Sequence, residues 1–233
     1  NRPSLVTDKV RFVGDPVACV IAQTPDAAKD AAELVSIDID ILPAATLATE
    51  AAMPGAPVLY DDVAGNIALD FQFGEPDTVD KAFKAAHHIS RVDIRNNRIV
   101  VAPMEPRSAI AHYNNETDSF TMRLGCQGTF GMRNQLAGIL NMEREKVRVL
   151  TENVGGSFGM KSFVYPEYIC LLHAAKKLSR PVKWTEERSS SFLSDQQGRD
   201  HEVKGELALN KEGDFLAVRL FLHSNLCLLY TSD

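Results

Sequence analysis

Residues 147–162 read VRVLTENVGGSFGMKS, a short β-branched run followed by three glycines within five positions. The run VRVL at 147–150 is typical of a strand. Glycine gives up more backbone freedom on folding than any other residue, so a cluster of glycines indicates a tight turn or a close approach to the backbone. We expect a strand, a glycine turn and a helix, with N–H groups aimed at an anionic or oxo group. A plain strand-to-helix turn is an equally compatible alternative.

The glycine stretch matches neither common nucleotide-binding motif. A P-loop needs glycine directly before its Lys-Ser pair, but Met160 stands before Lys161 and Ser162. Residues 155–159 do not form the GxGxxG pattern of a dinucleotide site either. The sequence therefore argues against a nucleotide-binding protein.

Hydrophobic periodicity predicts an α/β (α+β) protein. A small α/β unit comes first, and a mixed, largely antiparallel sheet domain with packed helices follows. Residues 42–66 show neither period and contain several prolines and glycines, so we expect a long linker there. The predicted strands are 17–22, 37–41, 67–73, 87–96, 107–113, 119–124, 147–150, 181–184, 202–210 and 215–223. The predicted helices are 25–36, 79–86, 131–141, 163–179 and 186–194.

Composition excludes several classes of protein. The 233 residues carry a net charge of −6, which does not favour binding to nucleic acid. No apolar run approaches the roughly 18 residues of a membrane span. The four cysteines form no CxxC pair, which argues against an iron–sulfur or zinc site in this chain. Their scatter fits a reducing compartment, so we expect a cytoplasmic protein. Because the chain starts at Asn1 rather than Met, we expect it to be part of a longer polypeptide.

A second turn, LGCQGTFG at 124–131, places Cys126 and Gln127 between two glycines, after a predicted strand and before a predicted helix. The Gln127 amide can donate a hydrogen bond to an oxo or carbonyl group. Cys126 is a candidate metal ligand or nucleophile. A lone cysteine is more often a small buried hydrophobe, and we favour that role.

Four other stretches are weaker candidates for chemistry. Residues 103–107, PMEPR, suit a surface ion pair in a turn better than catalysis. Asp200 and His201 within 198–201, and the pair at 87–88, are neighbours that point to opposite faces of a strand, so structural roles are favoured. The serines at 189–191 lack the GxSxG pattern of a serine hydrolase.

Several stretches in order resemble the molybdenum hydroxylase family, whose large subunits include those of xanthine dehydrogenase, aldehyde oxidase and carbon monoxide dehydrogenase. Residues 11–44, RFVGDPVACVIAQTPDAAKDAAELVSIDIDILPA, resemble part of its hammerhead domain. GAPVLYDD, APMEPRSAIAHY, GCQGTFGMRNQLAGIL, VRVLTENVGGSFGMKSFVYPE and RPVKWTEERSSSFLSDQQGRDH resemble its first molybdopterin-binding domain. The resemblance implies a hammerhead part at 1–43, a linker at 44–66 and a truncated cofactor-binding domain at 67–233.

The resemblance also implies a site. In this family the glycine turn lies against the molybdenum cofactor, and the glutamine of the earlier turn lies beside an oxo ligand of the metal. It thus implies cofactor binding by Gln127, Gly156, Phe158 and Gly159, with no metal ligand from this chain. The implied cofactor is molybdenum-molybdopterin, with the cytosine dinucleotide form among its variants.

The implied reaction hydroxylates an aldehyde, an N-heterocycle or a similar small substrate with oxygen derived from water. The catalytic glutamate of the family lies downstream of the matched stretch, so no catalytic residue maps here and we expect the chain alone to be inactive. Implied partners are an iron–sulfur small subunit and an FAD-binding medium subunit, in a complex that dimerises. The alternative is a scaffold or interaction fragment that holds no metal.

Three positions and the C-terminal stretch depart from the family pattern. Cys126 stands where many members have Thr or Ser, and Ser157 where many have glycine. Ser162 follows Lys161 where purine-oxidising members carry glutamate, which argues against xanthine as the substrate. The last residues, LCLLYTSD at 226–233, resemble nothing expected of the family, so their native origin is in doubt.

Overall fold

The computed structural model describes residues 3–225 and divides into two units, each built from two stretches of the chain. One unit combines residues 3–39 with 100–197, and the other combines 40–99 with 198–225. The chain therefore passes from one unit to the other three times. The short strands β2 (Ile99–Val100) and β7 (Gln197–Gly198), which pair with each other, lie at two of these passages.

The first unit holds a four-stranded mixed sheet in the order β5-β4-β3-β6. Strand β4 pairs parallel to β5, while β3 pairs antiparallel to both β4 and β6. The strands are β3 (Ser108–Asn114), β4 (Ser119–Leu124), β5 (Val147–Leu150) and β6 (Val182–Thr185). The helical elements are α1 (Pro25–Glu33), α4 (Thr129–Leu140), η2 (Arg144–Lys146), η3 (Met160–Ser162), α5 (Pro166–Leu178) and α6 (Arg188–Ser194).

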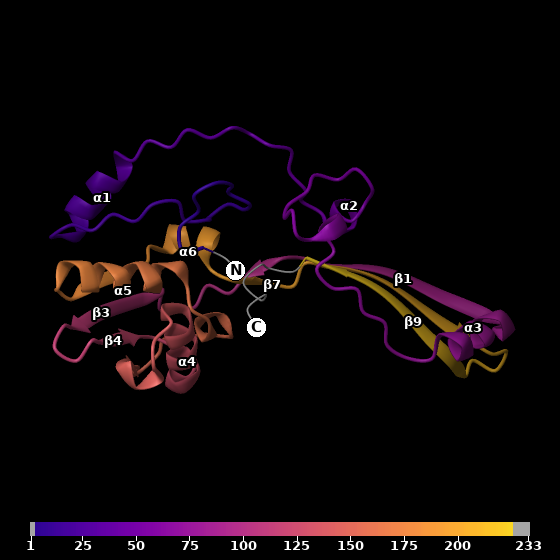
Figure 1. Cartoon of the computed structure of the whole chain (residues 1–233). Helices are drawn as coiled ribbons and strands as arrows, with labels where there is room; N and C mark the ends of the chain where they lie inside the picture. The colour runs from indigo at the N-terminus through magenta and orange to yellow at the C-terminus, as the bar shows by residue number, and fades with distance from the viewer. Residues whose placement is uncertain (1–2, 226–233) are drawn as a thin grey trace. The chain divides into compact units, whose positions relative to one another are not determined.

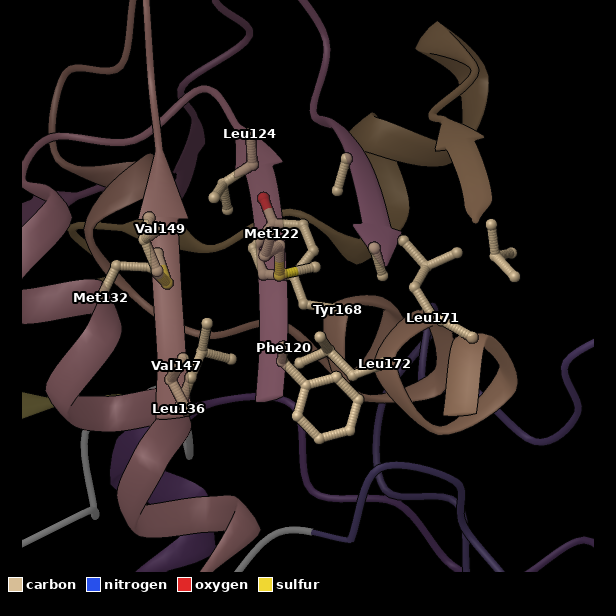
Figure 2. Close-up of a cluster of buried hydrophobic side chains, with 14 of the residues drawn as sticks. Phe120, Met122, Leu124, Met132, Leu136, Val147, Val149, Tyr168, Leu171 and Leu172 are labelled. Carbon is tan, nitrogen blue, oxygen red and sulfur yellow. The ribbon is translucent and has the colours of Figure 1, made fainter. Parts of the chain in front are cut away.

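The hydrophobic core lies between one face of this sheet and helices α4 and α5. Strand β4 alternates strictly, so Phe120, Met122 and Leu124 are 3%, 0% and 4% exposed while Arg123 points outward. Figure 2 shows these side chains meeting Met132 and Leu136 of α4 and Tyr168, Leu171 and Leu172 of α5. Burial of each large apolar side chain contributes about 1.5–3 kcal/mol, so this layer holds the strand ends in place.

The second unit holds an antiparallel sheet in the order β1-β8-β9. Its elements are α2 (Ala48–Ala51), η1 (Ala64–Asn66), α3 (Pro76–Ala85), β1 (His88–Asn96), β8 (His201–Leu209) and β9 (Phe215–Ser224) (Figure 1). Helix α3 packs on one face, where the Arg219 guanidinium lies 4.3 Å from the Phe83 ring centroid. The other face is apolar and exposed, with Val92 at 51% and Leu220 at 66%.

Most predicted elements in the sheets are confirmed. The strands predicted at 87–96, 107–113, 119–124, 147–150, 181–184, 202–210 and 215–223 are present, and so are all five predicted helices with shifted ends. Helix α1 begins at Pro25, and the Thr24 side chain accepts a hydrogen bond from the Ala27 N–H, as expected of an N-cap. Helix α5 begins at Pro166 rather than at residue 163.

The strands predicted at 17–22, 37–41 and 67–73 were wrong. These stretches have strand-like patterns, but no neighbouring strand pairs with them within residues 3–225, and a strand without a ladder leaves its backbone groups to water. Most of their apolar side chains are accordingly exposed, with Ile41 at 95% and Phe73 at 92%. The predicted linker also contains the short helix α2 and the turn η1.

Two further expectations concern membrane spans and the last residues of the chain. Among the described residues, no helix combines the length and apolar character that crossing a bilayer requires. The doubt about residues 226–233 concerns positions that lie outside the described residues.

Candidate functional site

Four loops of the first unit meet at the same end of its sheet. The turns after β4 and β5 lie together because these two strands are parallel neighbours, and the carboxyl ends of parallel strands share one edge. The loop before β3 and the segment after β6 join them because β3 is antiparallel to β4, and Ser108 pairs with Thr185. The sheet topology therefore gathers residues 102–107, 125–128, 151–162 and 186–195 into one region.

The side-chain carbonyl of Gln127 ties the two glycine-lined turns together. Its Oε1 accepts hydrogen bonds from the Ser157 hydroxyl at 2.6 Å, the Gly159 N–H at 2.9 Å and the Ser162 hydroxyl at 2.9 Å. The Gln127 N–H donates in turn to the Lys161 carbonyl at 3.2 Å. Because a backbone N–H can only donate, Oε1 must face the glycine turn, and the amide NH₂ must point away from it.

Glu105 explains why a glycine is needed at position 155. The Gly155 N–H donates to Glu105 Oε2 at 2.6 Å, and the Glu105 N–H donates to the Gly155 carbonyl at 3.1 Å. A Cβ on Gly155 would lie 2.6 Å from the Glu105 Cβ. Lys161, 1% exposed, donates from Nζ to Oε2 of the same glutamate at 3.0 Å and to its carbonyl at 2.9 Å. The close approach to this glycine is therefore made by the loop before β3.

The rest of the glycine turn has a left-handed backbone. Gly156 and Gly159 have φ of 100° and 98°, and Phe158, which is not a glycine, has φ of 50°. A Cβ on Gly156 would lie 3.0 Å from the Phe158 ring, so that ring folds over the glycine. Phe158 nevertheless remains 79% exposed. An exposed aromatic ring held in a strained conformation is typical of a functional site.

Arg107 holds the neighbouring segments together beneath these turns. Its buried guanidinium donates to both oxygens of Glu167 at 3.0 Å, to Glu186 Oε1 at 2.6 Å and to Asp195 Oδ1 at 2.5 Å. It also lies 3.7 Å from the centre of the Tyr165 ring. Three carboxylates thus depend on one arginine, which joins β3, α5 and the segment after β6.

Burial and pairing shift the pKa values of these carboxyls in opposite directions. Burial raises the pKa of Glu186 and of Asp195, although the Arg107 charge opposes the shift. At Glu105 partial burial opposes ionisation, but hydrogen bonds from Lys161 and Gly155 outweigh it and lower the pKa. Glu105 is therefore held ionised. Burial disfavours the charged forms of Glu186 and Asp195, and the nearby Arg107 cation partly offsets that effect.

The predicted site residues are brought together, and the other candidates are not. Gln127, Gly156, Phe158 and Gly159 all belong to the joined turns. A nearby pocket of about 170 Å³ is lined by Glu105, Gly125, Arg123 and Trp184 among others, but Gln127 and Gly156 do not line it. Gln127, Phe158 and Gly159 are instead exposed, beside the partly buried Gly156.

The remaining candidates take structural roles. Cys126 is 5% exposed within the hydrophobic core, as favoured from sequence. Asp200 accepts from Arg98 at 2.8 Å, while the His201 ring hydrogen-bonds Ser224 at 2.7 Å, so the adjacent pair shares no partner. Asp200 lies outside the strand, with φ of 63°, which corrects the reason given for that separation. Among the described residues, no cluster of three or more His, Cys, Asp or Glu side chains suits a metal ion.

Sequence reasoning missed the roles of five residues of the site. Ser157 and Ser162 were treated only as departures from a family pattern, yet both bind Gln127. From sequence, Lys161 matters only to the exclusion of a P-loop, yet its side chain forms an ion pair with Glu105. The surface ion pair expected at 103–107 was wrong, because Arg107 is 1% exposed and Glu105 pairs with Lys161. The available signal was a pair of opposite charges on either side of Pro106, at the start of a predicted strand.

Gly155→Ala tests the close approach of Glu105. We expect it to lower the unfolding free energy by about 1–3 kcal/mol, because its Cβ would overlap the Glu105 Cβ. A Glu105→Gly background removes that Cβ and should restore part of the loss, measured as a coupling in chemical denaturation. Gly159→Ala is the matched control: no atom lies within 4 Å of its Cβ, so its cost is conformational and independent of Glu105. Equal losses for Gly155→Ala in both backgrounds would contradict the contact.

Arg107→Met tests the buried charge cluster. Near neutral pH we expect the unfolding free energy to fall by about 3–5 kcal/mol, because buried carboxylates lose their cation. Without Arg107 these carboxyls have still higher pKa values when folded than when unfolded. The folded variant then binds more protons, so its deficit should shrink as pH falls toward about 4, the ordinary carboxyl pKa.

Urea titrations of Arg107→Met at several pH values measure this deficit. Arg123→Met, which removes an exposed arginine of the same sheet, is the control and should cost less than about 1 kcal/mol. A deficit that grows as the pH falls would refute the role of Arg107.

Comparison with known proteins identifies the family of the chain. Residues 59–231 match the molybdopterin cofactor-binding domain, and residues 1–43 match the a/b hammerhead domain of aldehyde oxidase and xanthine dehydrogenase. The gamma subunit of the 6-hydroxypseudooxynicotine dehydrogenase complex of Paenarthrobacter nicotinovorans is 36% identical over 219 residues, which cover 94% of this chain and 27% of that protein.

Solved structures of molybdenum hydroxylases have a similar fold. Reconstituted CO dehydrogenase from Oligotropha carboxidovorans matches with a TM-score of 0.89 and 28% identity, over 94% of this chain and 29% of its own. Quinoline 2-oxidoreductase from Pseudomonas putida 86 matches with a TM-score of 0.85 and 29% identity, over 94% and 28% of the two chains. The chain spans little more than a quarter of the length of these relatives. It belongs to the molybdenum hydroxylase large subunits, the family of xanthine dehydrogenase, aldehyde oxidase and carbon monoxide dehydrogenase.

Proposed function

We propose that this chain forms part of the molybdopterin-binding large subunit of a molybdenum hydroxylase, which hydroxylates an aldehyde, an N-heterocycle or a similar small substrate with oxygen from water. The observation that carries the proposal is the convergence of the Gln127 turn and the glycine turn on one wall. Relatives named for quinoline and for 6-hydroxypseudooxynicotine support a nitrogen-containing ring among the substrates.

The open hydrogen-bond donors of this wall fit a molybdopterin cofactor. Within the described residues, the N–H groups of Gly156, Ser157 and Phe158 donate to no other group. Helix α4 begins beside Gln127 with no side-chain cap on its N-terminus, so its first N–H groups are also open. A wall of donors at a helix N-terminus favours an electron-rich, anionic group carrying oxygen and sulfur atoms.

The residues of the wall have distinct roles in this proposal. Gln127 presents its NH₂ group as a donor, in an orientation set by the three hydrogen bonds to its carbonyl. Gly156 offers its open N–H to the cofactor, Gly159 leaves the space of a side chain empty beside it, and the exposed Phe158 ring limits access of water. When bound, the cofactor supplies the two-electron redox chemistry, and the protein contributes its position and its field.

The rest of the proposed enzyme lies outside these residues. The proposal places the catalytic glutamate further along the large subunit, so this chain alone is inactive. It includes the cytosine dinucleotide form of the cofactor, an iron–sulfur small subunit, an FAD-binding medium subunit and dimerisation of the complex. It also assigns 1–43 to the hammerhead domain, 44–66 to a linker and 67–233 to the first molybdopterin-binding domain. A cytoplasmic location is supported by Cys19, Cys126 and Cys170, which are free thiols.

Gln127→Glu in the assembled complex tests the role of the donor. Glutamate keeps an oxygen that accepts from Ser157, Gly159 and Ser162 but replaces the NH₂ donor with an acceptor. We expect turnover to fall about tenfold to a hundredfold, while the thermal midpoint stays within a few degrees of the parent. Metal analysis and pterin fluorescence report whether the cofactor is still bound.

Gln127→Ala is the comparison variant, because it removes both the donor and the acceptor. It should lose turnover as well and cost about 1 kcal/mol of stability, since three donors lose their partner. Full turnover in Gln127→Glu with normal molybdenum content would show that the amide does not act on the cofactor. A complex that never contains molybdenum or pterin would favour the scaffold alternative.

A further inference from the structure

One face of the β1-β8-β9 sheet in the second unit is apolar and open to solvent. Residues that pair directly across a sheet lie on the same face, so the row Val92, Gly205 and Leu220 fixes which side chains share it. On β8 this face continues with Val203 and Leu207, so the row and its neighbours carry no charge. We call this surface the apolar face. Five of its aliphatic side chains are 51–66% exposed: Val92, Ile94, Val218, Leu220 and Leu222.

The opposite face of the same sheet carries the charges. Arg91, Glu206 and Arg219 form a row on it, and Glu206 pairs with both arginines. Helix α3 packs on this charged face, because its Asp80 and Phe83 both contact Arg219. An antiparallel sheet commonly has one polar face in water and one apolar face on a core. This sheet has both kinds of face, but its apolar face is exposed as well.

The second unit has little hydrophobic core of its own. Among its described apolar side chains, only Phe83 and Ala208 are buried. The first unit instead buries side chains from four strands and two helices in one cluster. A sheet must bury its apolar face against another layer to form a stable domain. The apolar face therefore has the character of half a core, and the layer that covers it is missing from the described part of the second unit.

The relatives point to a source for the covering layer. The chain covers 27% of the gamma subunit from Paenarthrobacter nicotinovorans and 29% of the CO dehydrogenase chain, so most of each relative lies beyond the matched part. Interfaces that never come apart are more apolar than those that exchange, and an uncharged face suits a permanent contact. A layer of the same polypeptide meets this requirement better than a separate subunit or a second copy, both of which are free in solution before they assemble.

We propose that the apolar face docks an apolar layer of the same large subunit, formed by a part of that polypeptide outside this chain. Gly205 suits this role, because it lies in the middle row and has no side chain. A Cβ on it would lie 3.0 Å from Val92 Cγ1 and 3.4 Å from Leu220 Cδ2, so these two side chains close over the glycine. The middle of the face is therefore level, and a second layer can approach to the ~10 Å spacing of packed sheets. This inference rests on the proposed function, because it requires the chain to be part of a large subunit.

Cysteine labelling tests whether the apolar face is covered. Leu220→Cys places a thiol on the face, and the matched control Phe221→Cys places one at an exposed neighbour on the opposite face. Each variant is made both in this chain and in the complete large subunit of the purified complex. The native proteins are treated with iodoacetamide for timed intervals, and peptide mass spectrometry separates the introduced thiols from the natural cysteines.

In this chain alone we expect the two introduced thiols to react at similar rates. In the large subunit, the rate for Leu220→Cys should fall at least about tenfold relative to Phe221→Cys, because a buried thiol reacts only when the contact opens locally. Equal rates in the large subunit would overturn the proposal. Protection in this chain alone that grows with its concentration would indicate a second copy, and protection that requires the other subunits would indicate a subunit interface; either result also overturns it.

Leu220→Lys gives a second readout that does not depend on labelling. In this chain it should leave the thermal midpoint unchanged, because the side chain is exposed. In the large subunit it should lower the midpoint by several degrees or prevent assembly, since a charge would then be buried without a partner. Phe221→Lys is the control on the charged face and should have the smaller effect. A large subunit that accepts both substitutions equally well would refute the docking site.

The molybdenum content and turnover of the same complex separate this inference from the proposed function. Bound molybdenum and turnover, together with an unprotected thiol in Leu220→Cys, would overturn the inference and leave the proposed function intact. A protected thiol in a large subunit that never contains molybdenum would support the inference and count against the proposed function.

Discussion

The carbonyl oxygen of the Gln127 side chain joins the two halves of the site. Three donors from the glycine turn converge on this one atom. One of them, the Gly159 N–H, can only donate, whereas a hydroxyl can also accept. Each hydrogen bond contributes about 1 kcal/mol, but their joint effect is orientation, because they leave the amide one way to face. The NH₂ group therefore points where a ligand would lie. Ser157 and Ser162, which depart from the usual family pattern, are two of the three donors.

The placement of this amide depends on the layers beneath it. Parallel pairing of β4 and β5 brings the two turns to one edge, and the core on α4 and α5 holds the strands. Glu105 and Lys161 attach the glycine turn to the loop before β3. Arg107 then ties that loop to α5 and to the segment after β6. Removing any one of these ties would move a turn relative to its partner.

Sequence patterns predicted the sheets well where the partner strands are present. Alternation in SFTMRL and the short run VRVL was enough for β4 and β5, because one face of each is buried. The same alternation misled at 37–41 and 67–73, since a period of two indicates a strand only when another strand pairs with it. No local signal distinguishes those cases.

The site was predictable only in part. Glycine clustering and family resemblance were sufficient to select Gln127 and the turn, because both are local features of the chain. Arg107, Lys161 and the two serines could not be found in this way, since their roles arise from contacts between segments far apart in sequence. A buried arginine and an exposed one look identical in a string of residues. Burial and partners distinguish them, and these follow from the tertiary fold.

The most direct measurement is a crystal structure of the assembled complex in which anomalous scattering locates the molybdenum. We predict that an oxygen bound to the metal lies within hydrogen-bond distance, about 3 Å, of Gln127 Nε2. The open N–H groups of residues 156–158 should face the same cofactor. A molybdenum atom located away from both turns, with the Gln127 NH₂ group in bulk water, would contradict it.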